Sequence, residues 1–231
     1  MTSKIWMQLS IALFLVLLIY LGRNGSEQKA LLLQQPATTW SIQQSLLHKA
    51  IAGPLPGVAA DFAILNIFDI YSKSLKIEPE KRAPLWEQLH YQLQLAQNMD
   101  PYFKDVYRLS EGLLAFEANK TAEAIQLLTD SEPYLNSFEP LLVASFLAHQ
   151  ELNDLALALK LAKKSATQPD ASPLAVTFAS RLIQKKSGCA FAMAFLKSRL
   201  IRLPEKYRQG IKSRIKMLKE SQQCGTMNHI R

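Results

Sequence analysis

The chain has 231 residues, of which 48% are hydrophobic and 20% are charged. This length allows one domain with a hydrophobic core plus an appendage, and the composition excludes a disordered protein. Only 8 residues are glycine, whereas Leu, Ala, Gln and Lys are abundant. Because these residues lose little rotamer freedom in a helix, the composition favours helix nearly throughout.

The net charge of +8 is unevenly distributed. Residues 181–220 carry twelve Lys and Arg against two acidic residues, whereas residues 1–180 carry fourteen against seventeen. Such asymmetry can mark contact with anionic lipid or nucleic acid, or it can be a solvated helix face. For a lone basic segment the solvated face is the favoured interpretation.

The N-terminal residues 1–22 are expected to form a transmembrane signal anchor. Residues 5–21 carry no charge, and Trp6 and Tyr20 lie at opposite ends, where amphipathic rings prefer the membrane interfaces. This length is near the lower limit for crossing the hydrocarbon core. The alternative is a cleaved signal peptide, but no small-x-small site follows the apolar run. The positive-inside rule is nearly balanced, and an anchor of this kind favours the inner membrane with the soluble part on the periplasmic side.

Residues 23–57 are interpreted as a tether, because proline and glycine interrupt it at 34–39 and 53–57. Between these breaks, residues 40–50 fit a short helix or a strand. From Val58 the apolar residues recur every three or four positions through Tyr71, which predicts a helix with one buried face. Pro84 is predicted to open a second helix that ends at Asp100 and Pro101.

A fixed period of 34 residues follows. Ala124, Ala158 and Ala192 coincide at this shift, and turn residues precede each alanine, at 119–120, 153–154 and 187–188. Near the end of each unit lies a helix breaker, at Pro133, Pro169 and Pro204. The period predicts helix hairpins in which each alanine marks a close approach of the second helix to the first, with Gly112 in the matching position on one first helix. One hairpin cannot bury its apolar face alone, so neighbouring hairpins stack into a solenoid.

The helix-turn-helix unit of 34 residues resembles the tetratricopeptide repeat. The resemblance covers residues 101–204 as three units, with 58–100 as a degenerate unit before them. The soluble part also resembles a family of bacterial tetratricopeptide proteins with one membrane segment, in the stretches 58–65 and 100–108. The resulting fold class is all-α: a tetratricopeptide-like solenoid over residues 58–222, closed by a C-terminal capping helix and followed by a tail at 223–231.

No catalytic constellation is found in the sequence. The four histidines, His48, His90, His149 and His229, have no ligand-like spacing, and no phosphate-binding loop or nucleophile elbow occurs. The two cysteines lack metal-ligand spacing. The expectation is therefore a protein that is not an enzyme and that holds neither a metal nor another cofactor.

In the tetratricopeptide resemblance, the first helix of each hairpin lines a concave groove. The resemblance places twelve residues there, which are mainly apolar in the first two units and mainly polar in the third. An apolar groove suits an amphipathic helix or an extended apolar segment of a partner. The alternative is that residues 36–57 or the rest of the tether fill it. The carboxylate clamp that some such domains use for peptide tails is missing. The predicted groove residues are Val106, Leu109, Leu113, Phe116, Pro140, Val143, Leu147, Gln150, Leu174, Thr177, Arg181 and Gln184.

The C-terminal helix, predicted from Glu205 to about Gln222, places Ile211, Ile215, Met217 and Leu218 on one side. Its basic residues suit either a polar cap of the solenoid or contact with anionic lipid, whereas nucleic-acid binding is disfavoured because no aromatic platform accompanies the charge. Cys189 and Cys224 could pair outside the cytoplasm, or remain two thiols. The basic residues are Lys206, Arg208, Lys212, Arg214, Lys216 and Lys219.

These features together predict a scaffold or assembly factor of the bacterial envelope, which presents an apolar groove to another protein, an envelope or membrane-complex component. The alternative is a constitutive structural subunit of a larger membrane complex, with its groove permanently filled.

Overall fold

Prolines in the first turn open three of the long helices, where the missing N–H removes no hydrogen bond. They stand at the start of α3 (Pro56–Ser74), α4 (Ala83–Met99) and α10 (Pro173–Ser187). The computed structural model describes residues 55–221, and all regular secondary structure in this range is helical. The expected anchor, residues 23–54 of the tether, the tail and Cys224 lie outside the described residues. Within residues 55–221, no helix is both long and apolar enough to cross a membrane.

The remaining helices follow one another with short connections. A 3₁₀ turn, η2 (Pro79–Lys81), joins α3 to α4, and α5 (Lys104–Leu109) continues directly into the π-helix η3 (Ser110–Glu117). The other helices are α6 (Thr121–Asp130), α7 (Glu132–Leu135), α8 (Phe138–Gln150), α9 (Leu155–Thr167), α11 (Cys189–Arg202) and α12 (Glu205–Glu220).

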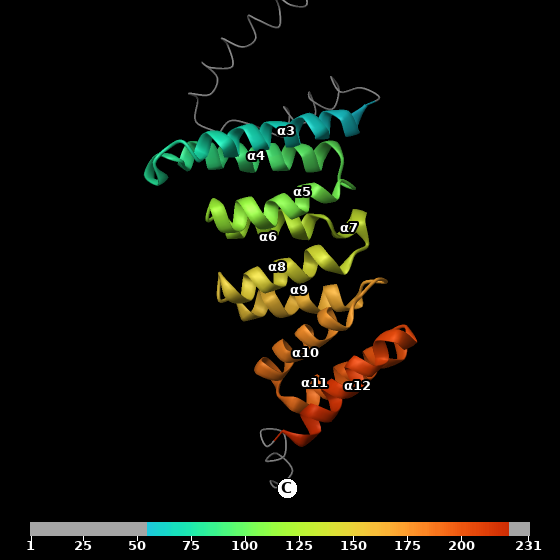
Figure 1. Cartoon of the computed structure of the whole chain (residues 1–231). Helices are drawn as coiled ribbons and strands as arrows, with labels where there is room; N and C mark the ends of the chain where they lie inside the picture. Colours follow the sequence, from blue (N-terminus) through green and yellow to red (C-terminus); the bar gives the residue numbers. More distant parts are fainter. Residues whose placement is uncertain (1–54, 222–231) are drawn as a thin grey trace, which may run out of the picture. The chain divides into compact units, whose positions relative to one another are not determined.

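Helices that are consecutive in sequence lie side by side as hairpins (Figure 1). The pairs are α3 with α4, η3 with α6, α8 with α9, and α10 with α11. Each second helix also packs against the first helix of the next hairpin, as α6 does on α8 and α9 on α10. Helices α8 and α10 are therefore covered on two sides, which links the hairpins into one core.

The tight turns inside three of the hairpins each contain a residue with a positive φ. Asn119 and Asn153 adopt left-handed φ angles of 54° and 50°, and Gly188 has a φ of 87°. After the first two, the next N–H reaches back six residues, from Lys120 to the Leu114 oxygen at 2.9 Å and from Asp154 to the Ala148 oxygen at 2.8 Å. Asn and Gly tolerate a positive φ better than other residues, which explains why they recur at this point of the period.

The repeated alanines occupy the most tightly packed positions of the second helices. Ala124, Ala158 and Ala192 are all completely buried. In the α8–α9 hairpin, the hydroxyl of the buried Ser145 donates to the carbonyl oxygen of Ala158 at 2.6 Å. The interpretation of Gly112 as a close-packing residue is wrong, since it is exposed and a Cβ built on it meets no atom within 4 Å.

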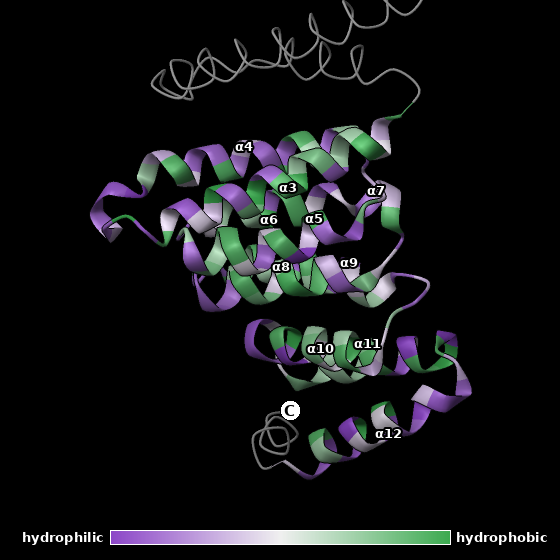
Figure 2. Ribbon diagram, turned by 45° about the horizontal axis from the view of Figure 1, so that its top comes forward, coloured by the Kyte–Doolittle hydropathy of each residue, from purple (hydrophilic) through white to green (hydrophobic). Residues whose placement is uncertain are grey.

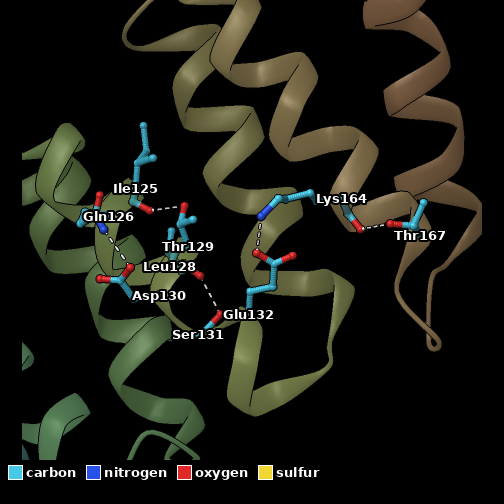
Figure 3. Close-up of polar contacts among 9 residues, drawn as sticks. All are labelled: Ile125, Gln126, Leu128, Thr129, Asp130, Ser131, Glu132, Lys164 and Thr167. Carbon is cyan, nitrogen blue, oxygen red and sulfur yellow. Dashed lines mark hydrogen bonds and ion pairs between the residues drawn. The ribbon is translucent and has the colours of Figure 1, made fainter.

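Polar contacts tie one hairpin to the next (Figure 3). Lys164 on α9 forms an ion pair with Glu132 on α7 at 2.5 Å. From the loop after α9, Asp170 accepts the backbone N–H of Phe138 at 2.8 Å and the hydroxyl of Ser137 at 2.8 Å. This carboxylate thus accepts a backbone N–H at the first turn of α8, although it lies about one repeat later in the sequence. The positive end of the helix dipole also favours a negative charge there.

Helix α12 packs against α10 and α11 through Ile211 and Leu218, both buried, and hydrophilic and hydrophobic bands alternate along its ribbon (Figure 2). Ile215 is half-buried against the same core. The placement of Met217 on the packed side is wrong, because its side chain is 59% exposed. With 3.6 residues per turn, Met217 lies 100° away from Leu218 and therefore points outward.

Candidate protein-binding surface

The first helices of three successive hairpins present apolar side chains to solvent. Exposed and half-buried residues recur every three or four positions along α5–η3, α8 and α10, the spacing of one helix face. Two contacts show that these faces adjoin: the Phe146–Phe178 pair joins α8 to α10, and a shallow hollow is lined by Arg108 and Val143 of α5 and α8. We call this surface the first-helix face: Leu109, Leu113, Phe116, Leu142, Val143, Phe146, Leu174, Phe178 and Arg181.

Aromatic rings dominate the middle of the first-helix face. Phe146 on α8 is 45% exposed, and its ring lies 6.4 Å from the ring of Phe178 on α10, with the planes tilted by 43°. One hairpin earlier, Phe116 is 56% exposed at the end of η3. Exposed aromatic residues of this kind combine a large apolar area with few rotatable bonds, which suits them to anchor a partner.

The structure divides the residues that the sequence assigned to a groove. Phe116, Gln150, Leu174 and Arg181 are exposed, whereas Leu109, Leu113, Val143, Thr177 and Gln184 are half-buried. Val106, Pro140 and Leu147 are buried, with Val106 and Leu147 completely so. Placing Val106 and Leu147 on a binding surface is wrong, because both side chains belong to the hydrophobic core, whereas Pro140 lines the shallow hollow between α5 and α8.

Sequence reasoning missed Leu142, Phe146 and Phe178. A usable signal was present, because Phe146 lies three residues after Val143 and four before Gln150, which were both placed on the surface. A helix face that contains these two residues must also contain Phe146.

The far end of the first-helix face meets the basic C-terminal helix. The Arg214 guanidinium on α12 donates to the side-chain oxygen of Gln184 on α10 at 2.8 Å. Burial, and next the neighbouring Arg181, lower the pKa of Arg214. Two arginines therefore lie close together here, so this end of the face favours an acidic group.

Four of the six predicted basic residues of α12, namely Lys206, Lys212, Lys216 and Lys219, are exposed. The other two are half-buried and engaged by the fold. Arg208 pairs with Glu205 and donates to the Leu203 oxygen at 3.1 Å, whereas Arg214 binds Gln184. The outer surface of this helix is thus lined by lysines rather than arginines.

The shallow hollow between α5 and α8 holds two carboxylates, Glu111 and Glu139. Burial, and next the charge of Glu139, raise the pKa of Glu111. Lys104 and Arg108 line the same hollow. The acidic and basic groups together give this edge of the first-helix face no strong net charge.

Cys189 is the first residue of α11 and is buried. Its sulfur is disulfide-bonded and also accepts the side-chain amide of Gln184 at 3.7 Å. The other cysteine of the sequence, Cys224, lies outside the described residues.

Histidines do not assemble a site in the described part of the chain. His90 on α4 is half-buried, and burial is the main cause of its lowered pKa. His149 is half-buried on α8, while His48 and His229 lie outside the described residues. Between residues 55 and 221, no three His, Cys, Asp or Glu side chains are grouped so that they could hold a metal ion.

No protein-family model, curated protein or solved structure matches this chain.

Proposed function

We propose that this chain is a membrane-anchored helical-repeat scaffold that binds an apolar segment of a partner protein on its first-helix face. The observation that carries the proposal is the aromatic centre of that face, where the exposed Phe146 and the half-buried Phe178 lie with ring centroids 6.4 Å apart. No enzymatic step is part of the proposal.

The apolar surface of the first-helix face argues for a partner, because exposing apolar side chains to water is unfavourable in free energy. Fully burying one large apolar side chain lowers the free energy by about 1.5–3 kcal/mol relative to leaving it in water. Contiguous apolar patches on soluble domains commonly mark interaction sites. Aromatic anchors at the centre of such a patch carry most of the binding energy in protein interfaces.

The chemistry of the face indicates the kind of segment that fits. Its middle is aliphatic and aromatic, and its far end carries Arg181 next to the Arg214 guanidinium. An amphipathic helix with an apolar stripe and an acidic residue near one end would match both parts. Arg181 is exposed, so such an ion pair would form at the rim and contribute more to orientation than to affinity.

The period of 34 residues and the stacked hairpins support a tetratricopeptide-like solenoid, a class that uses its first helices for peptide recognition. The uncharged run at residues 5–21 supports a membrane anchor, which would hold the scaffold at the inner membrane with its repeats on the periplasmic side. The partner would then be an envelope protein or a component of a membrane complex.

The test is capture of partners from intact membranes after cross-linking, with wild type compared with Phe146→Asp. The matched control is Ala156→Asp, at an exposed position of the second helix α9. We expect the Phe146 variant to lose the specific partner and the Ala156 variant to retain it. Equal recovery with both variants, at equal thermal stability, would place the binding surface elsewhere.

A further inference from the structure

Helix α11 presents large apolar side chains to solvent on its outer side. Ile201 is 79% exposed, more than any other large hydrophobic residue between residues 55 and 221, and Phe191 is 65% exposed. On the inner side of the same helix, Ala192 and Leu196 are completely buried. We call the seven exposed residues of this helix the α11 face: Ala190, Phe191, Ala194, Lys197, Ser198, Ile201 and Arg202.

The α11 face has an apolar centre with one basic residue on each side. An α-helix turns by about 100° per residue, so Phe191 and Ile201 lie about 80° apart around the axis, with small residues between them. Lys197 lies about 40° beyond Ile201, and Arg202 about 20° beyond Phe191 on the other side. Along the axis, Phe191 and Ile201 are roughly 15 Å apart. The face is therefore a strip that can touch a flat surface over most of the helix.

No acidic residue near the α11 face in the sequence offsets its positive charge. Residues 171–204 contain six Lys and Arg and no Asp or Glu. On the inner side of α11, Arg199 is buried, and its Nε atom has no hydrogen-bond partner among the described residues. Burial, and next the charge of Arg202, lower the pKa of Arg199. This local excess of positive charge attracts an anionic surface.

The other exposed apolar side chains at the two ends of the described fold have different surroundings. On α3, Phe62 and Leu65 are exposed, but Asp61 and Asp69 are exposed beside them. Anionic headgroups would repel these carboxylates. On α12, the exposed lysines accompany a single exposed large apolar side chain, Met217. The α11 face instead combines two such side chains with basic neighbours, the pattern of helices that lie in a membrane interface.

We propose that the α11 face docks on an anionic phospholipid surface. Phe191 and Ile201 insert between the headgroups, to the depth of about 5–10 Å that is typical of interfacial helices. Lys197 and Arg202 reach lipid phosphates from the two sides, because their long side chains keep the charged ends in the headgroup layer. Helix α11 then lies parallel to the surface.

Charge also disfavours a second copy of the chain as the occupant. Two α11 faces in contact would bring their basic residues together, and like charges across an interface are unfavourable. Helix α11 contributes no residue to the first-helix face. The inference therefore does not depend on a partner protein binding there.

Photo-cross-linking of the full chain in lipid vesicles tests the docking. A photoreactive amino acid replaces Ile201 or, as control, the exposed Ala156 on α9. The vesicles contain phosphatidylcholine alone or mixed with phosphatidylglycerol, and mass spectrometry identifies the adducts. With phosphatidylglycerol, we expect several-fold more lipid adduct from position 201 than from position 156. Without it, the adduct from position 201 should fall several-fold.

Charge reversal tests the role of the basic residues. Lys197→Glu combined with Arg202→Glu should reduce the lipid adduct from position 201 several-fold. Lys160→Glu combined with Lys163→Glu is the matched control, since it makes the same change in net charge at exposed positions of α9. This control should leave the adduct unchanged.

Four results would overturn the docking. Equal lipid adducts from positions 201 and 156 would show that α11 meets lipid only by chance. Equal adducts with and without phosphatidylglycerol, or equal effects of the two double variants, would show that the basic residues do not direct the contact. Adducts with a second copy of the chain would assign the α11 face to a protein interface. Absence of any adduct from position 201 would show that the face is solvated.

Discussion

The hydroxyl of Ser145 on α8 donates a hydrogen bond of 2.6 Å to the carbonyl oxygen of Ala158 on α9, and both residues are buried. A short serine side chain can reach the backbone of a neighbouring helix only where the two helices approach closely. The contact therefore explains why position 158 carries an alanine and not a larger residue.

The first prediction follows from this close approach. Ala158→Leu should lower the free energy of unfolding by about 1–3 kcal/mol, because the added atoms must displace the facing helix. Ala156→Leu is the matched control, since it makes the same change at an exposed position of the same helix. Urea unfolding of both variants measures the difference. Equal stability of the two would show that α9 does not pack tightly at Ala158.

A substitution at Gly112 is expected to stabilise the protein, in contrast to Ala158→Leu. Gly112 is exposed, its backbone is not left-handed, and no atom lies within 4 Å of a Cβ built there. Gly112→Ala should therefore raise the free energy of unfolding by about 0.4–1 kcal/mol, mainly by restricting the unfolded chain. Gly188→Ala should instead destabilise, because Gly188 has a φ of 87°. A destabilised Gly112→Ala variant would show that the close packing first inferred from sequence is real.

The left-handed conformation of the turn asparagines can be tested at Asn153, which is exposed and has a φ of 50°. Asn153→Gly should change the free energy of unfolding little, because glycine adopts this conformation without strain. Asn153→Val should lower it by about 1–2 kcal/mol, the cost of a left-handed conformation for a residue with a Cβ. Thermal unfolding of both variants provides the measurement, and similar effects of Gly and Val would argue against a left-handed turn.

His90 should make stability depend on pH. Burial lowers the pKa of His90 below 6.5, and Lys120 adds to this, while Glu123 and Glu87 oppose it. Between the lowered value and 6.5, the unfolded chain binds more protons at this residue than the folded chain does. The free energy of unfolding should therefore decrease as pH falls through this window.

The measurement compares wild type and His90→Gln by urea unfolding at pH 7.5 and pH 5.5. We expect wild type to lose more stability on acidification than the variant, which keeps the other three histidines. An identical loss in both proteins would show that His90 is solvated in the folded state.

The main helices and their order could be predicted from the sequence, because the spacing of alanines and turn residues follows from local geometry. Pro84 and Asp100 bound α4 as expected. Asn119 and Asn153 have positive φ, as turn residues between hairpin helices often do. These features depend on a few neighbouring residues, so their physical cause can be recognised without tertiary contacts.

Which side of each first helix is buried and which is exposed could not be predicted in the same way. Helix α8 is apolar nearly all round because α6 and α9 cover it on two sides, so periodicity alone does not separate Leu147, which is buried, from Phe146, which is exposed. Gly112 was misread for a related reason. A small residue in a helix can mark either a close contact or an open position, and only the neighbouring helix decides which applies.

The central claim is that the first-helix face binds a partner protein, and photo-cross-linking tests it most directly. A photoreactive amino acid is placed at Phe146 or, as control, at the exposed Lys163 of the second helix α9. Both variants are irradiated in intact cells that express the full chain. The account predicts one discrete adduct from position 146 that is absent from position 163 and is lost with Phe178→Asp. Equal adducts from both positions, or none from position 146, would contradict it.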